Sequence, residues 1–430
     1  MAKIILAINA GSSSVKVSVY KAHPDEKIAS HKLELKAVAQ ISGLTAPPAK
    51  LKYVKLGSTS KEKIKDQEVK NVSTQEDAFE YILNHLIEDH GLPELHSKES
   101  FSCTCHRVVH GGDYPSAHII DQETIHHLEE LTDLAPLHNA SALAIVKTCI
   151  QSLPKARNIA FFDSAFHASI PEAVRTYPID PQVAQKNKLR KYGFHGLSYA
   201  FITNVVAGHL GKPHSQVNLI ALHLGSGASA CAIRNGKSLD NSMGLTPLDG
   251  LPGATRSGSV DPSLIFHFTH DAGRPSPSST KEMHISTAEE ILNKKSGWKA
   301  LTGTTDFGDI SSSKDPKCEL AFEIVVDRIC GFVGSYYVKL EGNVDALVFA
   351  GGIGEKGAKL RATVVEKCRC LGFEIDERKN EAEKGDGKDE VTSIGKEDAR
   401  HDVLVVQTNE EYQMASGCLE DPSLFNVESG

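Results

Sequence analysis

The chain has 430 residues and a formal net charge of −8, and 40% of its residues are hydrophobic while 24% are charged. This length predicts two domains rather than one, and the composition is typical of a soluble globular protein. The negative charge argues against nucleic acid or an anionic membrane as the main partner, and no apolar stretch reaches the roughly 20 residues of a membrane span.

The first half of the chain alternates between strand-like and helix-like patterns. Alternating apolar residues predict strands, and apolar residues spaced by three or four predict helices. In chain order, the patterns predict a hairpin with strands at 4–8 and 15–19 around a polar turn at 11–14, a Lys-rich surface excursion at about 45–75, a helix at 76–95 that stops at Gly91, a strand within 102–114 that ends in a Gly-Gly turn, two helices within 121–152, and a buried strand that ends at Asp163.

The second half opens with the same kind of unit as the first. An apolar run, a Gly-Ser turn and an alternating strand follow one another, and Gly225 of this turn lies 214 residues after Gly11 of the first. This offset also places His223 opposite Asn9. A strand, turn and strand of the same kind at the start of each half predict a duplicated domain.

Further elements follow to the end of the chain. Capping residues before a long apolar periodicity predict a helix, and an Asn-Gly pair between alternating strands predicts a type I′ turn. In chain order, the patterns predict a hairpin turn at 235–236, a long helix within 311–342, an apolar strand that opens into a glycine-rich turn within 344–357, a charged and irregular surface insertion at 376–400, and a last strand and terminal helix within 402–416.

The nine cysteines are an odd number in a long chain, which predicts reduced thiols and a cytoplasmic protein. Cys103 and Cys105 form a C-x-C pair, as do Cys368 and Cys370. Neither pair has the C-x-x-C spacing of zinc or redox sites, although His106 follows the first. Buried or incidental thiols are therefore favoured over a metal site.

Three glycine-rich turns follow apolar strands. Glycine lets backbone N–H groups point toward a ligand and lets a phosphate approach closely, and serine hydroxyls add donors. One such turn is ordinary, but three, of which two occupy duplicated positions, predict a phosphate-binding cleft between two related domains. These turns lie at 11–14, 225–227 and 351–354.

Several charged or polar side chains lie in apolar or tightly turning sequence. Arg107 and Arg256 each lie beside a glycine-rich turn, and Asp163 ends an apolar run. Each arginine alone is more typical of a structural ion pair, but two of them beside phosphate turns suggest an anion clamp. His195 is flanked by glycines, and His223 lies in the second turn strand. Arginines, histidines and carboxylates around phosphate turns are what phosphoryl transfer requires.

A series of motifs resembles the acetate kinase family. The resemblance covers residues 4 to about 415, and the motifs are specific when taken together. In chain order they are INAGSSSVK, HRVVHGG, APLHN, FDSAFH, YGFHG, HLGSG, MGLTPLDG, TRSGSVDP, AGGIGE and TNEE. The polar stretches near 45–75 and 376–400 depart from compact bacterial and archaeal forms and look more like a eukaryotic or otherwise divergent member.

The resemblance implies an α/β fold with duplicated ribonuclease-H-like, actin-like ATPase domains and an active-site cleft between them. Residues 1–164 with 412–430 would form the acetate and phosphate domain, and 165–411 the nucleotide-binding domain. The implied reaction is the reversible, Mg²⁺-dependent, in-line transfer of the ATP γ-phosphoryl group to acetate, which gives acetyl phosphate and ADP. A homodimer in the cytoplasm is implied as well.

The resemblance also assigns roles to individual residues. Asn9 and Glu410 would hold the metal. Arg107 and Arg256 would bracket the acetate carboxylate and the phosphoryl group, and His195 would stabilise the transition state. Asp163 would be the catalytic acidic residue that places the acetate or assists metal placement. The other residues implied are the acetate methyl pocket of Val109, Leu137, Phe194 and Pro247, the phosphate contacts Ser12, Ser14, Lys16, His223, Gly225, Ser226 and Gly227, and the nucleoside contacts Asp306, Phe307, Gly308, Gly352, Ile353 and Gly354.

Four departures from the family motifs concern the phosphoryl donor. Ser226 replaces an Asn, Ala254 a Gly, Gly308 an Arg and Lys356 an Asn, whereas the acceptor motifs are intact. Pyrophosphate therefore stays open as an alternative donor, and another short-chain acid as an alternative acceptor. A nucleotide-regulated, non-catalytic protein on the same fold is a further alternative, which the intact acceptor residues argue against.

Overall fold

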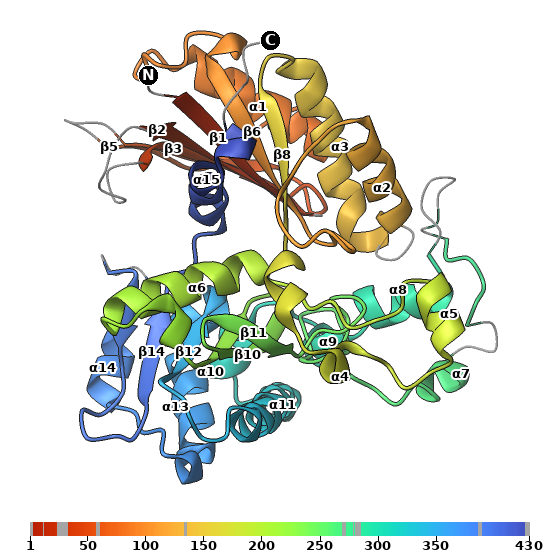
Figure 1. Cartoon of the computed structure of the whole chain (residues 1–430), viewed down its shortest axis with the longest axis vertical. Coiled ribbons are helices and arrows are strands. Elements are labelled where there is room, and N and C mark those ends of the chain that lie inside the picture. Colours follow the sequence, from red (N-terminus) through yellow and green to blue (C-terminus); the bar gives the residue numbers. More distant parts are fainter. Residues whose placement is uncertain are drawn as a thin grey trace. The chain divides into compact units, whose positions relative to one another are not determined.

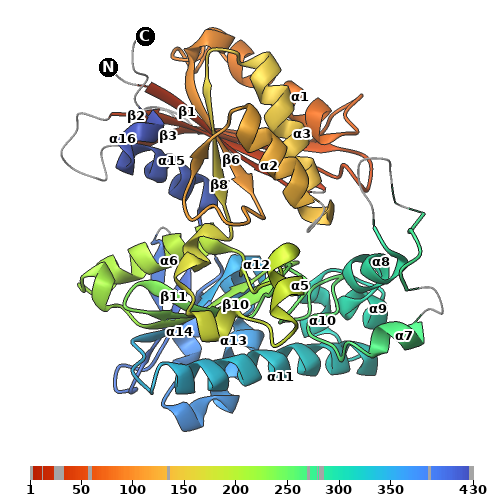
Figure 2. The same ribbon diagram turned by 45° about the vertical axis from the view of Figure 1, so that its right-hand side comes forward.

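The computed structural model describes residues 3–11, 13–23, 33–56, 61–132, 136–268, 272–277, 279, 285–385 and 389–425. The chain divides into two compact units: unit 1 is Met1–Ala165 with Asn409–Gly430, and unit 2 is Phe166–Thr408. Each unit is built on its own β-sheet with helices against it (Figures 1 and 2). Within the described residues, no helix is long and apolar enough to cross a membrane.

The sheet of unit 1 has the strand order β5-β4-β3-β2-β1-β6-β8-β7. Strands β1, β6 and β8 run parallel to one another, so their carboxyl ends meet at one edge. Strand β2 forms the predicted antiparallel hairpin with β1. The strands are β1 (Lys3–Ala10), β2 (Ser14–Ala22), β3 (Leu33–Ser42), β4 (Lys50–Leu56), β5 (Lys61–Glu68), β6 (Phe101–Val108), β7 (His118–Ile119) and β8 (Arg157–Phe162).

Helices cover both faces of this sheet. Ile4, Leu6 and Ile8 of β1 join a buried cluster with side chains of α1 and α3. Helix α15 contacts β1, β2 and β6 from the opposite face, and Figure 2 shows it on the other side of the sheet from α1 and α3. The helices of unit 1 are α1 (Gln75–Glu88), α2 (Gln122–Thr132), α3 (Pro136–Ser152), α15 (Glu410–Glu420) and α16 (Pro422–Phe425).

The sheet of unit 2 has the strand order β11-β10-β9-β12-β14-β13. Strands β9, β12 and β14 are parallel, and β10 forms a hairpin with β9. The apolar core lies between this sheet and the long helix α11. The strands are β9 (Leu219–Leu224), β10 (Ala228–Arg234), β11 (Lys237–Asn241), β12 (Ala346–Ala350), β13 (Val391–Ser393) and β14 (Asp402–Val406).

The long helix α11 of unit 2 begins at a capping residue, as the sequence predicted. Asp315 accepts from the backbone N–H of Lys317 at the start of α11, with Pro316 in the first turn. The helices are α4 (Glu172–Arg175), α5 (Pro181–Lys186), α6 (Gly196–His209), α7 (Leu264–Phe268), α8 (Thr287–Lys294), α9 (Gly297–Thr302), α10 (Phe307–Ser312), α11 (Pro316–Lys339), α12 (Gly351–Lys356), α13 (Ala358–Lys367) and α14 (Glu377–Ala382).

The two sheets share one topology, which confirms the predicted duplication. The order β3-β2-β1-β6-β8 in unit 1 corresponds to β11-β10-β9-β12-β14 in unit 2, and β1–β2 and β9–β10 form the first hairpin of each sheet. Asn235 and Gly236 both have positive φ, 53° and 73°, as the predicted type I′ turn requires. The α/β class with duplicated domains was therefore predicted correctly.

The prediction of a surface excursion at 45–75 is wrong. Strands β4 and β5 extend the sheet of unit 1 through this stretch. Leu51 and Tyr53 are buried while Lys50 and Lys52 are exposed, so the alternation of a strand was present beneath the lysines. Lysines are common on such outer strands because they prevent pairing with another chain.

Two further predictions in unit 2 need correction. The stretch 376–400 is not an irregular insertion, because it contains α14 and the edge strand β13, which pairs with β14. The glycine-rich segment at 351–354 is not a turn but the start of helix α12. A β-carbon on Gly351, whose φ is +74°, would lie 2.7 Å from the carbonyl oxygen of Leu224, so only glycine permits this close approach.

Candidate active site

The first group of predicted site residues lies at the carboxyl edge of the unit 1 sheet. Asn9 is near the end of β1, Arg107 near the end of β6, and Asp163 directly follows β8. Because these strands are parallel, the topology brings their last residues together. Glu410, the first residue of α15, joins them from the far end of the sequence.

Arg107 makes the central contacts of this group. Its Nη2 donates to Asp163 Oδ2 at 2.7 Å, and its Nε donates to both Asp163 oxygens at 3.1 and 3.2 Å. Its Nη1 donates to Glu410 Oε2 at 2.6 Å and to Asn9 Oδ1 at 3.3 Å. The guanidinium fork is therefore held in one orientation by two carboxylates that lie on different elements.

Lys16 and Glu411 complete this group of side chains. We call the whole group the Arg107 cluster; it consists of Asn9, Lys16, Arg107, Asp163, Glu410 and Glu411. Lys16 Nζ donates to Glu411 Oε2 at 2.7 Å, and Asn9 Nδ2 donates to Glu410 Oε2 at 2.8 Å. Asn9 and Lys16 are register partners across the β1–β2 hairpin, so both reach α15 from the same face.

The negative charges around Arg107 favour its ionised form. Burial lowers the pKa of Arg107, but the negative charges of Asp163 and Glu410 outweigh that effect, so its pKa lies above the ordinary value. The Asp163 side chain is only 1% exposed. A carboxylate buried to this extent is stable as an anion because the bidentate guanidinium compensates its charge.

The same cluster offers ligands that suit a magnesium ion. The Asn9 amide oxygen and the Glu410 carboxylate are hard oxygen donors, the kind that Mg²⁺ prefers. Three carboxylates face two cationic side chains in the cluster, which leaves one excess negative charge. The residues present therefore fit a divalent cation held through one or two side chains and water.

The loop after β6 is fixed by two other predicted motifs. Asn139 Oδ1 accepts a hydrogen bond from the His110 backbone N–H, and Asn139 Nδ2 donates one to the His110 carbonyl; both distances are 2.9 Å. Ser164 accepts from the Gly111 N–H at 3.0 Å. A β-carbon on Gly111 would lie 2.4 Å from the Phe162 ring, so glycine is required here. The motif residues of this loop hold the backbone in place.

Two residues expected in the methyl pocket belong to unit 1, and one expected phosphate contact is not described. Val109 is partly buried in the loop after β6. Leu137 lies in the first turn of α3, and its side chain is outside the described part. Ser12 also lies outside the described residues, whereas Ser14 begins β2 and its carbonyl accepts from the Gly11 N–H at 2.9 Å.

In unit 2 the Gly-Ser turn lies against the loop that carries Arg256. The Ser226 carbonyl accepts from the Ala254 N–H at 2.8 Å, and the Gly225 N–H donates to the Gly227 carbonyl at 3.1 Å. A β-carbon on Gly227 would lie 2.9 Å from Arg256 Nη1. The structure thus places the second glycine-rich turn beside Arg256, one of the two arginines of the predicted anion clamp.

His195 and His223 stack beside this turn, with ring centroids 4.2 Å apart. His195 Nδ1 lies 2.8 Å from Ser229 Oγ, which in turn lies 2.6 Å from the Tyr199 hydroxyl. His195 has a φ of 59°, a left-handed conformation that is strained for a side chain of this size. Such strain at the start of α6 is typical of a functional position.

The remaining two residues expected in the methyl pocket are buried in unit 2. Phe194 is 1% exposed, and its carbonyl accepts from Asn241 Nδ2 at 3.2 Å. Its carbonyl also lies 2.9 Å from His167 Nε2. Burial lowers the pKa of His167 to about 4, so this ring is neutral at physiological pH. Pro247 is buried too, and its carbonyl accepts from Arg256 Nη1 at 3.4 Å.

Five of the six residues expected to contact the nucleoside line one pocket of unit 2, here called the α12 pocket. Its volume is about 370 Å³, within the range of small-molecule sites. Asp306 caps α10 by accepting from the Gly308 N–H at 2.7 Å, and Phe307 packs edge-on against Trp298. The pocket is lined by Asp306, Phe307, Gly308, Ser311, Gly352, Ile353, Lys356, Gly357, Ala358, Lys359 and Leu360. Gly354, also expected here, is buried in α12.

Sequence reasoning missed several residues that support these sites. Glu411 neighbours the predicted Glu410, and its part in the motif TNEE could have indicated it. Lys359 lines the α12 pocket and donates to the Ser311 carbonyl at 2.6 Å. Arg361 holds the carbonyl oxygens of α12 from a fully buried position. A lone arginine on an otherwise ordinary helix carried no signal of this role.

Comparison with known proteins shows similarity over nearly the whole chain. The model of the acetokinase family matches residues 4–416. A Neurospora crassa protein named "Probable acetate kinase" is 56% identical, over 98% of this chain and 94% of that protein. Porphyromonas gingivalis acetate kinase is 32% identical, with a TM-score of 0.78 over 99% of this chain and 100% of that one. A propionate kinase from Francisella tularensis is 33% identical, with a TM-score of 0.80 over 96% and 98%.

Proposed function

The chain belongs to the acetokinase family, and on this premise we propose that it transfers the γ-phosphoryl group of ATP to acetate, reversibly, giving acetyl phosphate and ADP. One observation carries the proposal beyond the family: Arg107 is held by two carboxylates at the edge where the parallel strands of unit 1 end. In the transfer, an acetate oxygen forms a bond to the γ-phosphorus while the bond to the bridging oxygen of ADP breaks.

In this proposal Arg107 binds the anionic reactants, and Asp163 positions it. Within the described part of the chain, Arg107 Nη2 donates to Asp163 alone, so one of its two hydrogens is available to a ligand oxygen. Arg256 and His195 of unit 2 would supply further positive charge and a hydrogen-bond donor for the equatorial oxygens of the transferring group. Fixed donors of this kind stabilise charge without reorganisation during the reaction.

We propose Mg²⁺ as the metal, with Asn9 and Glu410 as the side chains that hold it. When bound, the ion would neutralise the phosphate oxygens of the nucleotide and align them with the acceptor. Lys16 then balances the charge of Glu411, which its ammonium group contacts at 2.7 Å. We also propose a reducing compartment, the cytoplasm, since all nine cysteines are free thiols.

ATP is proposed as the donor because five of the six residues expected at the nucleoside line one pocket of suitable size. A rate comparison with acetate, Mg²⁺ and either ATP, GTP or pyrophosphate tests this, with acetyl phosphate trapped by hydroxylamine. The expected result is activity with ATP that depends on acetate. Activity with pyrophosphate alone would disprove the donor but keep the acceptor, and silence with all three donors would disprove the function.

Replacing Lys356 is expected to affect the nucleotide only. Lys356→Ala removes a cationic side chain from the α12 pocket and should raise the KM for ATP about tenfold, the equivalent of about 1.4 kcal/mol. The KM for acetate should not change. Lys367→Ala is the matched control, because Lys367 is exposed at the end of the next helix, α13, and does not line the pocket. Equal effects of the two variants would contradict the prediction.

His195→Ala is expected to lower kcat about 100-fold, the usual cost of removing one donor to a developing charge. Ser229→Ala leaves the ring in place but removes its Nδ1 partner, and should lower kcat about tenfold. Steady-state kinetics with both substrates saturating would measure both effects. Ser169→Ala, which removes a hydroxyl bonded to the Ser238 carbonyl, should keep wild-type rates. Wild-type kcat in His195→Ala would refute a role for this ring.

We propose that the protein is a homodimer that uses the exposed apolar side chains of α7. Phe266 is 75% exposed and Phe268 is 44% exposed, although aromatic side chains are usually buried. Light scattering should give twice the mass of one chain for the wild type. Phe266→Asp should shift the equilibrium toward the monomer, whereas Val338→Asp, at a residue of α11 that is 74% exposed, should not.

A further inference from the structure

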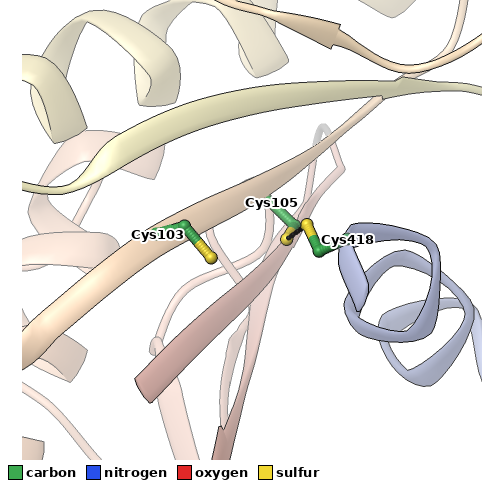
Figure 3. Close-up of side chains that lie close together, drawn as sticks. All are labelled: Cys103, Cys105 and Cys418. Atoms are coloured by element: carbon green, nitrogen blue, oxygen red, sulfur yellow. Dashed lines mark hydrogen bonds between the residues drawn. The ribbon is translucent and has the colours of Figure 1, made fainter. Parts of the chain in front are cut away.

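Three cysteine side chains converge in the interior of unit 1. Cys103 and Cys105 come from β6 and Cys418 comes from α15, and Figure 3 shows their side chains close together between strand and helix. Their sulfur atoms all lie within 4.8 Å of one another, and Cys105 Sγ lies 3.1 Å from Cys418 Sγ. Within the described residues this is the one such group of three or more His, Cys, Asp or Glu ligand atoms.

The three cysteines meet because side chains alternate along β6 and helix α15 packs on one face of that strand. Cys103, Cys105 and Arg107 are two residues apart along β6, so their side chains point to the same face, which α15 covers. Glu410 at the start of α15 contacts Arg107, and Cys418, two turns later, contacts Cys105. The helix therefore runs along the strand with one contact at each of these points.

The surroundings of the thiols suit a soft ligand. The three residues are at most 2% exposed, and the Cys105 and Cys418 thiols are within hydrogen-bond distance of each other. Hydrogen bonds from the Cys105 and Cys418 thiols lower the pKa of Cys103 well below its ordinary value, against the opposite effect of burial, and the charges of Lys3 and Arg157 lower it further.

We propose that Cys103, Cys105 and Cys418 form a buried binding site for one soft, monovalent d¹⁰ metal ion, with Cu(I) as the probe. Three sulfur atoms around one ion with bonds of about 2.3 Å lie about 4 Å apart. The observed separations allow this arrangement after a shift of about 1 Å at the Cys105–Cys418 pair. Each thiol that becomes a ligand releases one proton, and no electron is transferred.

Two other fates of the thiols are less consistent with the geometry. A structural zinc site takes four ligands, and within the described residues the group supplies three. A two-coordinate or three-coordinate thiolate site is instead typical of soft monovalent ions, because thiolates select them over harder ones. A disulfide between Cys105 and Cys418 would need an oxidant and would remove two of the three ligands.

The test uses reduced, metal-free, full-length protein under anaerobic conditions. Cu(I) is supplied as its bicinchoninate complex with excess chelator, so that only a competitive site acquires copper. The expected result is one copper per chain by native mass spectrometry, with new thiolate-to-copper absorption in the ultraviolet. A rise in the thermal unfolding temperature should accompany it, since an ion bound to the folded state stabilises that state.

Variants distinguish the site from adventitious thiol binding. Cys418→Ala and Cys105→Ala should each lose the bound copper, and thermal unfolding would verify that they fold. Cys149→Ala, at another buried cysteine of unit 1 that is outside the group, should keep it. The proposal is overturned if the wild type retains no more copper than Cys418→Ala, or if Zn²⁺ displaces Cu(I).

Discussion

Arg107→Ala is expected to lower kcat about 1000-fold, which corresponds to about 4 kcal/mol of lost transition-state stabilisation. Arg107 is the one cation that contacts both Asp163 and Glu410 within the described residues, at 2.7 and 2.6 Å. Its removal takes away a donor to the reacting anions and also leaves the carboxylates of the cluster facing one another. Stopped or coupled assays of acetyl phosphate formation would measure the loss.

The same variant should destabilise unit 1, because removing one partner of a buried ion pair costs about 3–5 kcal/mol. Thermal and urea unfolding would separate this effect from catalysis. Arg107→Lys keeps the charge but not the two-pronged geometry, and should recover stability more than it recovers kcat. Arg157→Ala is the control on the neighbouring strand β8, since Arg157 donates to carbonyls of α16 and should leave kcat unchanged. Wild-type rates in Arg107→Ala would remove it from the proposed site.

Arg361→Met is expected to cost about 3–5 kcal/mol of stability in unit 2, because it leaves several buried carbonyl groups without their donor. The Arg361 side chain is fully buried, and Nη1 donates to the Gly354 carbonyl at 2.8 Å and the Glu355 carbonyl at 2.6 Å. Nη2 donates to the carbonyls of Asn380 and Glu383. Burial lowers the pKa of Arg361 to about 10, so it remains protonated at neutral pH.

The hydrogen bonds of Arg361 also connect helix α12, which lines the pocket proposed for the nucleotide, to helix α14, which does not. Gly354 and Glu355 belong to α12, which lines the pocket proposed for the nucleotide, while Asn380 belongs to α14 in the charged stretch. The variant should therefore raise the KM for ATP more than the KM for acetate. Arg369→Ala removes an exposed arginine that forms a long ion pair with Glu366 at 3.9 Å, and it should change neither KM. A variant as stable as wild type would contradict the buried-carbonyl argument.

Local patterns were sufficient for much of the fold. The first hairpin of each sheet, the helix after Asp315 and the turn at Asn235 depend on residues that are neighbours in sequence. Alternation and capping therefore indicated them directly. The secondary-structure predictions were wrong in two stretches where the types of residue present suggested a loop or turn but the chain forms a strand or helix. Lysines hid the alternation of Leu51 and Tyr53, and glycines at 351–354 suggested a turn where a helix begins.

The order of residues along the chain was enough to identify the family, the duplication and the chemical types of the site residues, because motifs and repeats are local or periodic features of a sequence. Which of those residues are in contact depends on the fold. Arg107 and Glu410 are 303 residues apart and Cys105 and Cys418 are 313 apart, yet each pair is in contact. These pairs meet because the parallel strands of unit 1 pair with one another and α15 packs on one face of the sheet they form. A local sequence pattern carries no information about contacts between elements that are about 300 residues apart.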